Sequence, residues 1–157
     1  MRSQRRLLRD NWYGWPVWTW ARLQSKTGSG KVYFYQFSHV TRFPKNSPMS
    51  GMGAAHGFEL IYTFGHTDYL PNTATAEDRQ MVSTLSSYWT NFAKNGDPNG
   101  PGLPKWPKQT KKDGYEVMHL TQGSSDTVHA APSTVRARYE LLERLAAEPA
   151  PTSTASR

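Results

Sequence analysis

The chain has 157 residues, of which 36% are hydrophobic and 13% aromatic, enough for one ordinary domain with its own core. Six tryptophans and eight tyrosines argue against a disordered chain, since disorder accompanies a low aromatic content. The absence of cysteine excludes disulfides, thiolate metal sites and a cysteine nucleophile.

Basic residues outnumber acidic ones by 19 to 12, which gives a net charge of +7. Such an excess is typical of proteins that bind nucleic acid or anionic surfaces, but a solvated face has the same composition. We favour the solvated face and expect no nucleic-acid partner. No stretch approaches the length of a transmembrane helix, and the charged start lacks the apolar core of a secretory signal peptide. The compartment, cytoplasmic or exported, stays open.

Two helices are predicted before the first strand. The first is short and basic, covers residues 3–12 and turns Trp12 inward; the second begins at Pro16, which suits a first turn, and ends at Gly28. Four tryptophans fall in this region: Trp12, Trp15, Trp18 and Trp20. They could form a stacking platform for bases or sugars. We favour packing on a core, because tryptophan side chains bury much area.

Two strands are predicted further along the chain. Residues 31–38 are aromatic and β-branched, with apolar side chains at both alternating sets of positions. This pattern suits a strand covered on both faces in an α/β sheet. Residues 115–120 alternate between apolar and polar and form the second predicted strand. The predicted fold class is therefore α/β, with a few core strands flanked by helices.

The strongest helix signal lies in the middle of the chain. Thr75 and Asp78 have the spacing of a capping box, and Lys94-Asn95-Gly96 is a fitting helix end. The apolar face predicted between these ends consists of Met81, Val82, Leu85, Tyr88, Trp89, Phe92 and Ala93. A shorter helix or turn is predicted over residues 58–64.

The end of the chain divides into a helix and a tail. Residues 135–147 have apolar positions at helical spacing. The tail over residues 148–157 is rich in proline, alanine, threonine and serine, and we expect it to be disordered. One domain over residues 1–147 is therefore expected.

The candidate functional residue is His56, which lies between Ala55 and Gly57. Small neighbours allow another segment or a substrate to approach the imidazole, and a histidine can act as a general base near neutral pH. An isolated histidine beside glycine is more often a satisfied loop or helix-cap residue, so this pattern alone leaves both interpretations open.

The partners that a catalytic histidine needs are not evident in the sequence. No Gly-x-Ser-x-Gly elbow occurs; Gly28-Ser29-Gly30 has the wrong spacing and precedes a strand. The only acid upstream of His56 is Asp10, and Glu59 is better placed to brace the local turn than to orient the ring. The five histidines have no paired zinc-type spacing, so no metal site is predicted, and no phosphate-binding glycine loop is present.

Several motifs, taken together in order, resemble the C-terminal part of a type-B carboxylesterase of the cholinesterase and para-nitrobenzyl esterase branch. They are Trp18-Thr19-Trp20-Ala21-Arg22-Leu23-Gln24, Val32-Tyr33-Phe34-Tyr35-Gln36-Phe37, Ala55-His56-Gly57-Phe58-Glu59-Leu60 with Tyr62-Thr63-Phe64-Gly65, and Tyr88-Trp89-Thr90-Asn91-Phe92-Ala93-Lys94-Asn95-Gly96-Asp97-Pro98-Asn99 with Trp106-Pro107. The resemblance covers about residues 5–122. It implies the α/β-hydrolase fold, of which this chain would be a C-terminal fragment.

The resemblance also implies roles for individual residues. His56 would be the general acid/base of a Ser-His-acid triad, and Glu59 would lie behind it and hold the histidine loop. Tyr62 would be a pocket wall or core residue, and Phe64 is expected in the core. In this fold the serine and the acid precede the histidine. The chain is therefore expected to be inactive alone and to need an upstream N-terminal half, with a small-molecule ester as substrate and no cofactor.

A second hypothesis is a non-enzymatic interaction module. Its basic N-terminus and tryptophan cluster would bind a protein, nucleic acid or an anionic surface, and the histidine motif would be a remnant. It explains fewer residues than the ordered motifs do. Neither hypothesis identifies a particular substrate, because acyl and alcohol selectivity depend on pocket residues outside this chain.

Overall fold

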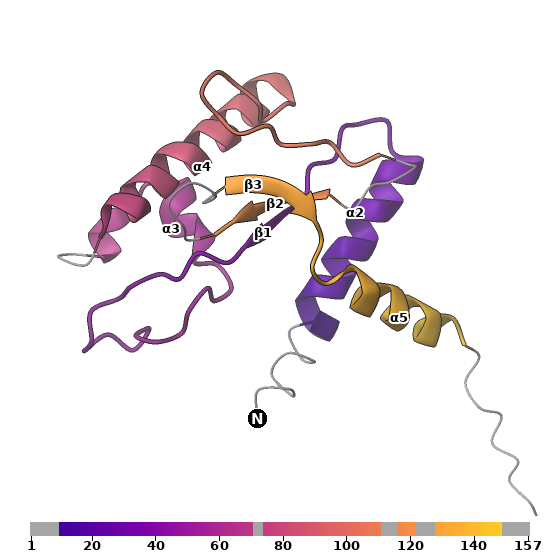
Figure 1. Cartoon of the computed structure of the whole chain (residues 1–157), viewed down its shortest axis with the longest axis horizontal. Coiled ribbons are helices and arrows are strands. Elements are labelled where there is room, and N and C mark those ends of the chain that lie inside the picture. The colour runs from indigo at the N-terminus through magenta and orange to yellow at the C-terminus, as the bar shows by residue number, and fades with distance from the viewer. Residues whose placement is uncertain (1–9, 71–73, 111–115, 122–127, 149–157) are drawn as a thin grey trace, which may run out of the picture.

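A computed structural model describes residues 10–70, 74–110, 116–121 and 128–148. Its centre is a three-stranded mixed sheet with helices on both sides (Figure 1). The strands are β1 (Tyr35–Phe37), β2 (Glu116–Leu120) and β3 (Val128–Pro132). The helices are η1 (Asp10–Gly14), α2 (Trp15–Thr27), α3 (Glu59–Thr63), η2 (Thr67–Tyr69), α4 (Ala76–Asn95) and α5 (Arg136–Ala147). The prediction of α/β architecture is confirmed.

The sheet has the order β1-β2-β3, with β1 parallel to β2 and β3 antiparallel to β2. Opposite Met118 stand Tyr35 and Ala130, and opposite His119 stand Gln36 and His129. Side chains alternate between the two faces of a sheet, so each of these rows belongs to one face. The parallel pair requires a long crossover from β1 to β2, and that crossover carries α3 and α4.

The first strand is shorter than predicted, and one strand was missed. Only residues 35–37 of the predicted 31–38 belong to β1, while residues 31–34 and 38 belong to no helix or strand. The structure has β3 where no strand was predicted. That segment is Val-His-Ala-Ala-Pro, whose small alanines and terminal proline give little β propensity, so its pairing with β2 decides its conformation.

The prediction of α4 is confirmed at both ends. Thr75 and Asp78 form a reciprocal capping box, and Gly96 ends the helix in the left-handed conformation at φ 64°. The apolar face packs into the main core through Met81, Leu85 and Tyr88. The last predicted positions of this face differ, because Phe92 and Ala93 lie exposed near the end of the helix.

The tryptophan cluster does not pack as a unit. Trp18 is buried, whereas Trp12 and Trp20 are 68% and 70% exposed, so the predicted packing is wrong for these two residues. The reason is the helical period: two residues turn a helix by about 200°, so Trp20 projects away from the side that carries Trp18. Most of the predicted helix at 3–12 lies outside the described residues, and so does the predicted tail beyond residue 148.

Candidate functional site

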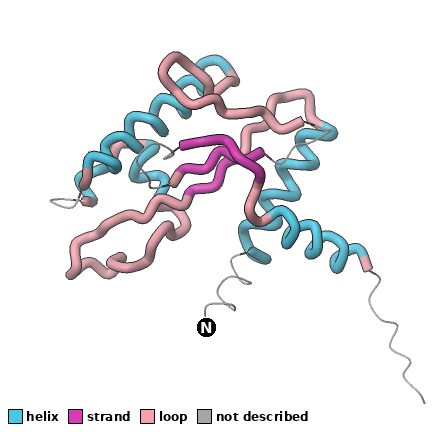
Figure 2. Tube along the Cα trace, viewed as in Figure 1, coloured by secondary structure: helices cyan, strands magenta, loops and turns pink. Residues whose placement is uncertain are grey.

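His56 lies on the long loop that connects β1 to α3, a pink excursion in Figure 2. Two glycines flank it in left-handed backbone conformations, Gly53 at φ 70° and Gly57 at φ 83°. Larger residues are strained at these angles, so the path of the loop depends on glycine. The amide of Phe58 donates to the carbonyl of Ala55 over 3.2 Å and closes a turn around His56. The loop thus presents His56 at the surface, with its side chain exposed.

The imidazole borders a depression of about 370 Å³ between β1, the start of α2 and the start of α5. Its lining comprises Tyr13, Gly14, Val17, Phe34, Tyr35, Gln36, Phe37, Ser38, Ala54, His56, Val135 and Tyr139. The depression is mostly apolar, with His56 and a few hydroxyl and amide groups at its boundary. This combination is typical of a site for a small, largely apolar molecule.

The ring of Tyr13 stacks on the imidazole of His56. The two ring centroids are 4.9 Å apart and the planes are inclined by 25°. Tyr13 belongs to η1, far from His56 in the sequence. No sequence signal linked these two residues, because neither periodicity nor motif spacing reports a contact between a helix end and a distant loop.

Glu59 begins α3 and is half-buried. Burial raises the pKa of Tyr35 to about 12, and the charge of the Glu59 carboxylate adds to that increase, so Glu59 lies near β1. Within the described ranges the structure records no hydrogen bond or ion pair between Glu59 and His56. Glu59 therefore lies where the histidine loop enters α3, and the recorded contact of the imidazole is with Tyr13.

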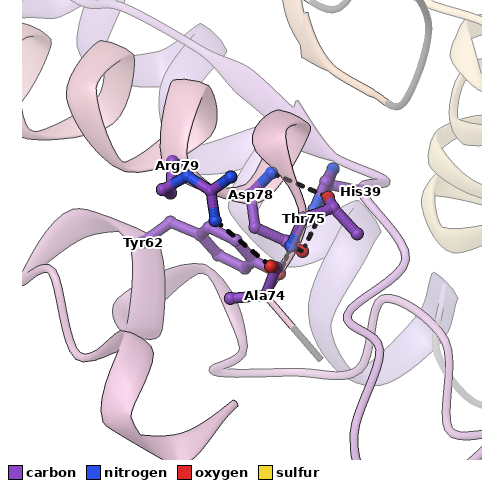
Figure 3. A network of polar contacts seen from close by, with 6 residues as sticks. All are labelled: His39, Tyr62, Ala74, Thr75, Asp78 and Arg79. Atoms are coloured by element: carbon purple, nitrogen blue, oxygen red, sulfur yellow. Dashed lines mark hydrogen bonds and ion pairs between the residues drawn. The ribbon is translucent and has the colours of Figure 1, made fainter. Parts of the chain in front are cut away.

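A second group of side chains is a buried polar network centred on Asp78 (Figure 3). Oδ1 of Asp78 lies 2.7 Å from Nε2 of His39 and accepts a hydrogen bond of 2.9 Å from the hydroxyl of Tyr62. Oδ2 accepts hydrogen bonds from the amide and the hydroxyl of Thr75, at 2.7 and 2.9 Å. Three segments therefore meet at one carboxylate: the chain after β1, α3 and the start of α4.

The network is buried, and both carboxylate oxygens of Asp78 have partners. His39, Tyr62 and Asp78 are each at most 1% exposed. Burial acts to raise the pKa of the Asp78 carboxyl, but the hydrogen bonds donated to it outweigh burial and hold that pKa below its ordinary value. The sequence indicated only the capping role of Asp78; its second oxygen serves His39 and Tyr62, which no local pattern reports.

The two aromatic residues that follow the histidine motif separate in the structure. Tyr62 is fully buried and packs edge-on against His39, with ring centroids 4.8 Å apart. Phe64 is 67% exposed, so its predicted place in the core is wrong. It follows the last residue of α3, just before the chain turns at Gly65, so it lies beyond the part of the helix that packs in the core.

Another hollow in the described structure lacks the side chains for acid–base chemistry that a catalytic site would need. It is larger, at about 680 Å³, and lies between α4 and residues 101–104, where hydroxyl, amide and apolar side chains line it. Among the described residues, no group of three or more histidine, cysteine or acidic side chains is arranged to hold a metal ion. In the same part of the chain, no helix is long and apolar enough to cross a membrane.

Known proteins with similar sequences include esterases and related hydrolases. Rat carboxylesterase 1C is 33% identical over 112 residues, which is 71% of this chain and 20% of that protein. Human cocaine esterase is 39% identical over 92 residues, 57% of this chain and 16% of that protein. The medium-chain fatty acyl-CoA hydrolase precursor of the duck Anas platyrhynchos is 38% identical over 91 residues, 58% of this chain and 16% of that protein.

Solved structures of PNB esterases have the same fold. A thermophilic PNB esterase superposes with a TM-score of 0.72 at 26% identity, covering 90% of this chain and 28% of that structure. A second PNB esterase gives 0.70 at 26% identity, covering 90% and 27%. The chain therefore spans a fifth or less of the relatives named above and somewhat over a quarter of these structures, and its predicted α/β-hydrolase fold is confirmed.

The family assignment rests on most of the chain. The sequence model of the carboxylesterase family matches residues 1–139, which include the histidine loop, the network at Asp78 and the three strands. With relatives above 30% identity and PNB esterases of the same fold, this chain belongs to the carboxylesterase family and is a segment of the α/β-hydrolase fold.

Proposed function

We propose that His56 is the general base of a serine carboxylesterase that hydrolyses small carboxylic esters. The observation that carries this proposal is the exposed imidazole on a glycine-flanked loop after a core strand, bordering a mostly apolar depression. The proposed nucleophilic serine, triad acid and oxyanion hole come from polypeptide outside these 157 residues, since the sequence has no Gly-x-Ser-x-Gly elbow. We further propose that residues 1–147 form the C-terminal portion of that catalytic domain.

The proposed reaction uses His56 in two proton transfers per half-reaction. The imidazole takes the serine hydroxyl proton as the serine oxygen attacks the ester carbonyl carbon. When the tetrahedral intermediate collapses, the bond to the leaving alcohol breaks and the imidazolium returns the proton to that oxygen. A water molecule then repeats the sequence on the acyl-enzyme and releases the carboxylic acid. No metal or organic cofactor takes part in this scheme.

We propose that Glu59 is a positioning residue that holds the histidine loop. Its support is its place at the first residue of α3, half-buried and close to Tyr35. In the complete enzyme, Glu59→Gln should lower kcat while leaving KM for a short ester nearly unchanged. A rise in KM alone would assign Glu59 to substrate binding instead.

The partner proposed for this chain is the remaining part of the same catalytic domain. Its proposed contact is the α2 patch, which we define as Trp12, Val17, Trp20 and Leu23, all exposed apolar side chains. Three of them recur at intervals of three residues along α2 and so share one side of the helix. Exposed apolar patches of this kind mark interaction surfaces in soluble proteins.

The experiment is hydrolysis of p-nitrophenyl acetate by the 157-residue chain, alone and after co-expression with the upstream part of a related carboxylesterase. We expect no turnover above background from the chain alone. Co-expression should give turnover that His56→Ala abolishes, with His66→Ala as the matched control because His66 is also exposed. Robust turnover by the 157 residues alone, lost in His56→Ala, would overturn the assignment of the serine and acid to another segment.

A second candidate function is a non-enzymatic interaction module, and the α2 patch is the observation that favours it. The charges do not favour nucleic acid: Arg22 pairs with Glu143, and Lys31 pairs with Asp97 at 2.9 Å. Binding to generic DNA that weakens steeply between low and moderate salt would support the electrostatic version of this candidate. Absence of such binding, together with ester hydrolysis after co-expression, would eliminate it.

A further inference from the structure

The His56 imidazole makes an aromatic contact with a residue from the first part of the chain. Among the described residues, the ring that contacts it is Tyr13, with centroids 4.9 Å apart and planes inclined by 25°. A β-carbon added at Gly53 or Gly57 would meet no atom within 4 Å, so these two positions border open space, whereas Phe58 anchors the end of the loop by packing on Phe43. At the imidazole itself, the contact that the structure records among the described residues is the stacked ring of Tyr13.

Tyr13 is held from behind by contacts between η1 and α5. Asp10, at the start of η1, is buried and pairs with Nε of Arg138 at 2.8 Å. At the end of η1, a β-carbon on Gly14 would lie 2.0 Å from the hydroxyl oxygen of Tyr139, so glycine is required for this close approach. Tyr139 is itself buried against Trp18, with ring centroids 5.7 Å apart. Both ends of the short η1 segment are thus anchored.

Neither core packing nor a hydrogen bond of its hydroxyl explains where the Tyr13 side chain lies. Its side chain remains 50% exposed, and the structure gives its hydroxyl no hydrogen bond within the described ranges. An aromatic ring stacked on an imidazole gains contact area. The face of the aromatic ring carries partial negative charge, so it attracts the imidazole when the imidazole is protonated. The geometry therefore favours a role of the ring face rather than of the hydroxyl.

We propose that Tyr13 is a positioning residue for His56: its ring face holds the imidazole in one orientation over the depression and stabilises the imidazolium formed during proton transfer. This inference rests on the proposed function of His56 as a base. It assigns to η1 a role in the reaction that the sequence motifs do not indicate. Orientation matters because misplacing a catalytic group by about 1 Å can cost roughly 100-fold in rate.

The first test is NMR on the 157-residue chain, which needs no catalytic partner. In the unmodified protein, we expect an NOE between the ring protons of Tyr13 and those of His56. The His56 ring protons should also resonate upfield of their positions in urea, because they lie over a ring face. Tyr13→Phe should keep the upfield shift, Tyr13→Leu should abolish it, and Trp12→Leu, which changes the exposed neighbour, should leave it unchanged.

Two outcomes would overturn the proposal. One is absence of the NOE in the unmodified chain, a result that does not depend on whether any variant folds. The other is an upfield shift that survives Tyr13→Leu or disappears in Tyr13→Phe, because the ring face would then not be the cause. A lack of esterase activity after co-expression would instead contradict the proposed function and leave the NMR result standing.

The second test is kinetic and uses the co-expressed enzyme. Tyr13→Leu should lower kcat by roughly 10- to 100-fold with little change in KM, and Tyr13→Phe should restore kcat. A rise in KM with unchanged kcat would mean that Tyr13 contacts the substrate and does not position His56. That result would overturn the proposal.

Discussion

The two faces of the sheet are built from different chemistry. The core face carries Tyr35, Phe37, Met118 and Leu120 and packs against α3 and α4 in one aromatic and aliphatic cluster. The polar face carries the row Gln36, His119 and His129 and lies toward α2 and α5. On the core side, α3 and α4 bury Tyr62, Met81, Leu85 and Tyr88, whereas on the polar side Trp12 of η1 and Trp20 of α2 are exposed.

This difference separates stability from function. The core face unites β1, α3 and α4 through the Asp78 network and needs no further partner for its polar groups at Asp78. The depression beside His56 lies at the other side, between β1, α2 and α5. We therefore expect substitutions on the core face to act on folding and those around η1 and α2 to act on the proposed reaction and docking.

The largest effect is expected from Asp78→Ala. It leaves the buried donors His39, Tyr62 and Thr75 without their common acceptor, which should cost about 3–5 kcal/mol of unfolding free energy. Urea denaturation followed by tryptophan fluorescence measures the loss. Asp68→Ala is the control, because the Asp68 side chain is 79% exposed and should change stability by no more than about 0.5 kcal/mol. Equal losses of stability in the two variants would contradict the claim that the Asp78 network on the core face determines stability.

A smaller loss is expected from Tyr62→Phe. It removes only the hydroxyl that donates to Asp78 over 2.9 Å and keeps the ring in the core. One lost hydrogen bond to a buried carboxylate should cost about 1.5–3 kcal/mol in the same urea experiment. Tyr69→Phe, at an exposed tyrosine, should have almost no effect. A neutral Tyr62→Phe would mean that the network does not tie α3 to α4.

On the polar face, stability should depend on the protonation of His119. Burial lowers the pKa of His119 below its ordinary value, and the neighbouring His129 adds to this effect. The unfolded chain then binds the proton more readily than the folded protein, so stability rises with pH up to the unfolded pKa of about 6.5. It should fall as the pH decreases below that value, and His119→Gln should flatten this part of the curve. An unchanged slope in His119→Gln would contradict the assignment.

The smallest effect on stability is expected from Trp20→Ser in the α2 patch. Because Trp20 is mostly exposed, the substitution should change the unfolding free energy of the protein by no more than about 0.5 kcal/mol. Co-purification with the upstream part of a related carboxylesterase should nevertheless decrease. Unchanged co-purification, or a large loss of stability, would show that the patch is not the proposed docking surface.

Local patterns predicted the elements whose determinants are close in sequence. The capping box at Thr75 and Asp78 and the period of α4 needed no tertiary information, and α2 and α5 began near their predicted residues. The strand β3, which was not predicted, has a weak intrinsic preference for β structure and depends on pairing with β2. The exposed side chain of Phe64 depends on where α3 ends and the chain turns.

The sequence singled out two residues of the candidate site, and their roles stay predictions. The glycine-flanked motif indicated His56, and the family resemblance added Glu59 three residues later. The stack of Tyr13 on His56 and the contact of His39 with Asp78 join distant segments. Such contacts depend on how helices dock on the sheet, and no periodicity in a single sequence encodes them.

Chemical rescue tests the central claim, that His56 is the base of the complete enzyme, most directly. The co-expressed His56→Gly variant should hydrolyse p-nitrophenyl acetate poorly, and added imidazole should restore turnover with saturation, because the vacated space lies on an exposed loop beside the depression. After the hydrolysis by imidazole without enzyme is subtracted, the same imidazole concentrations should not accelerate the enzyme with His56 intact. Full turnover by His56→Gly without imidazole would contradict the claim.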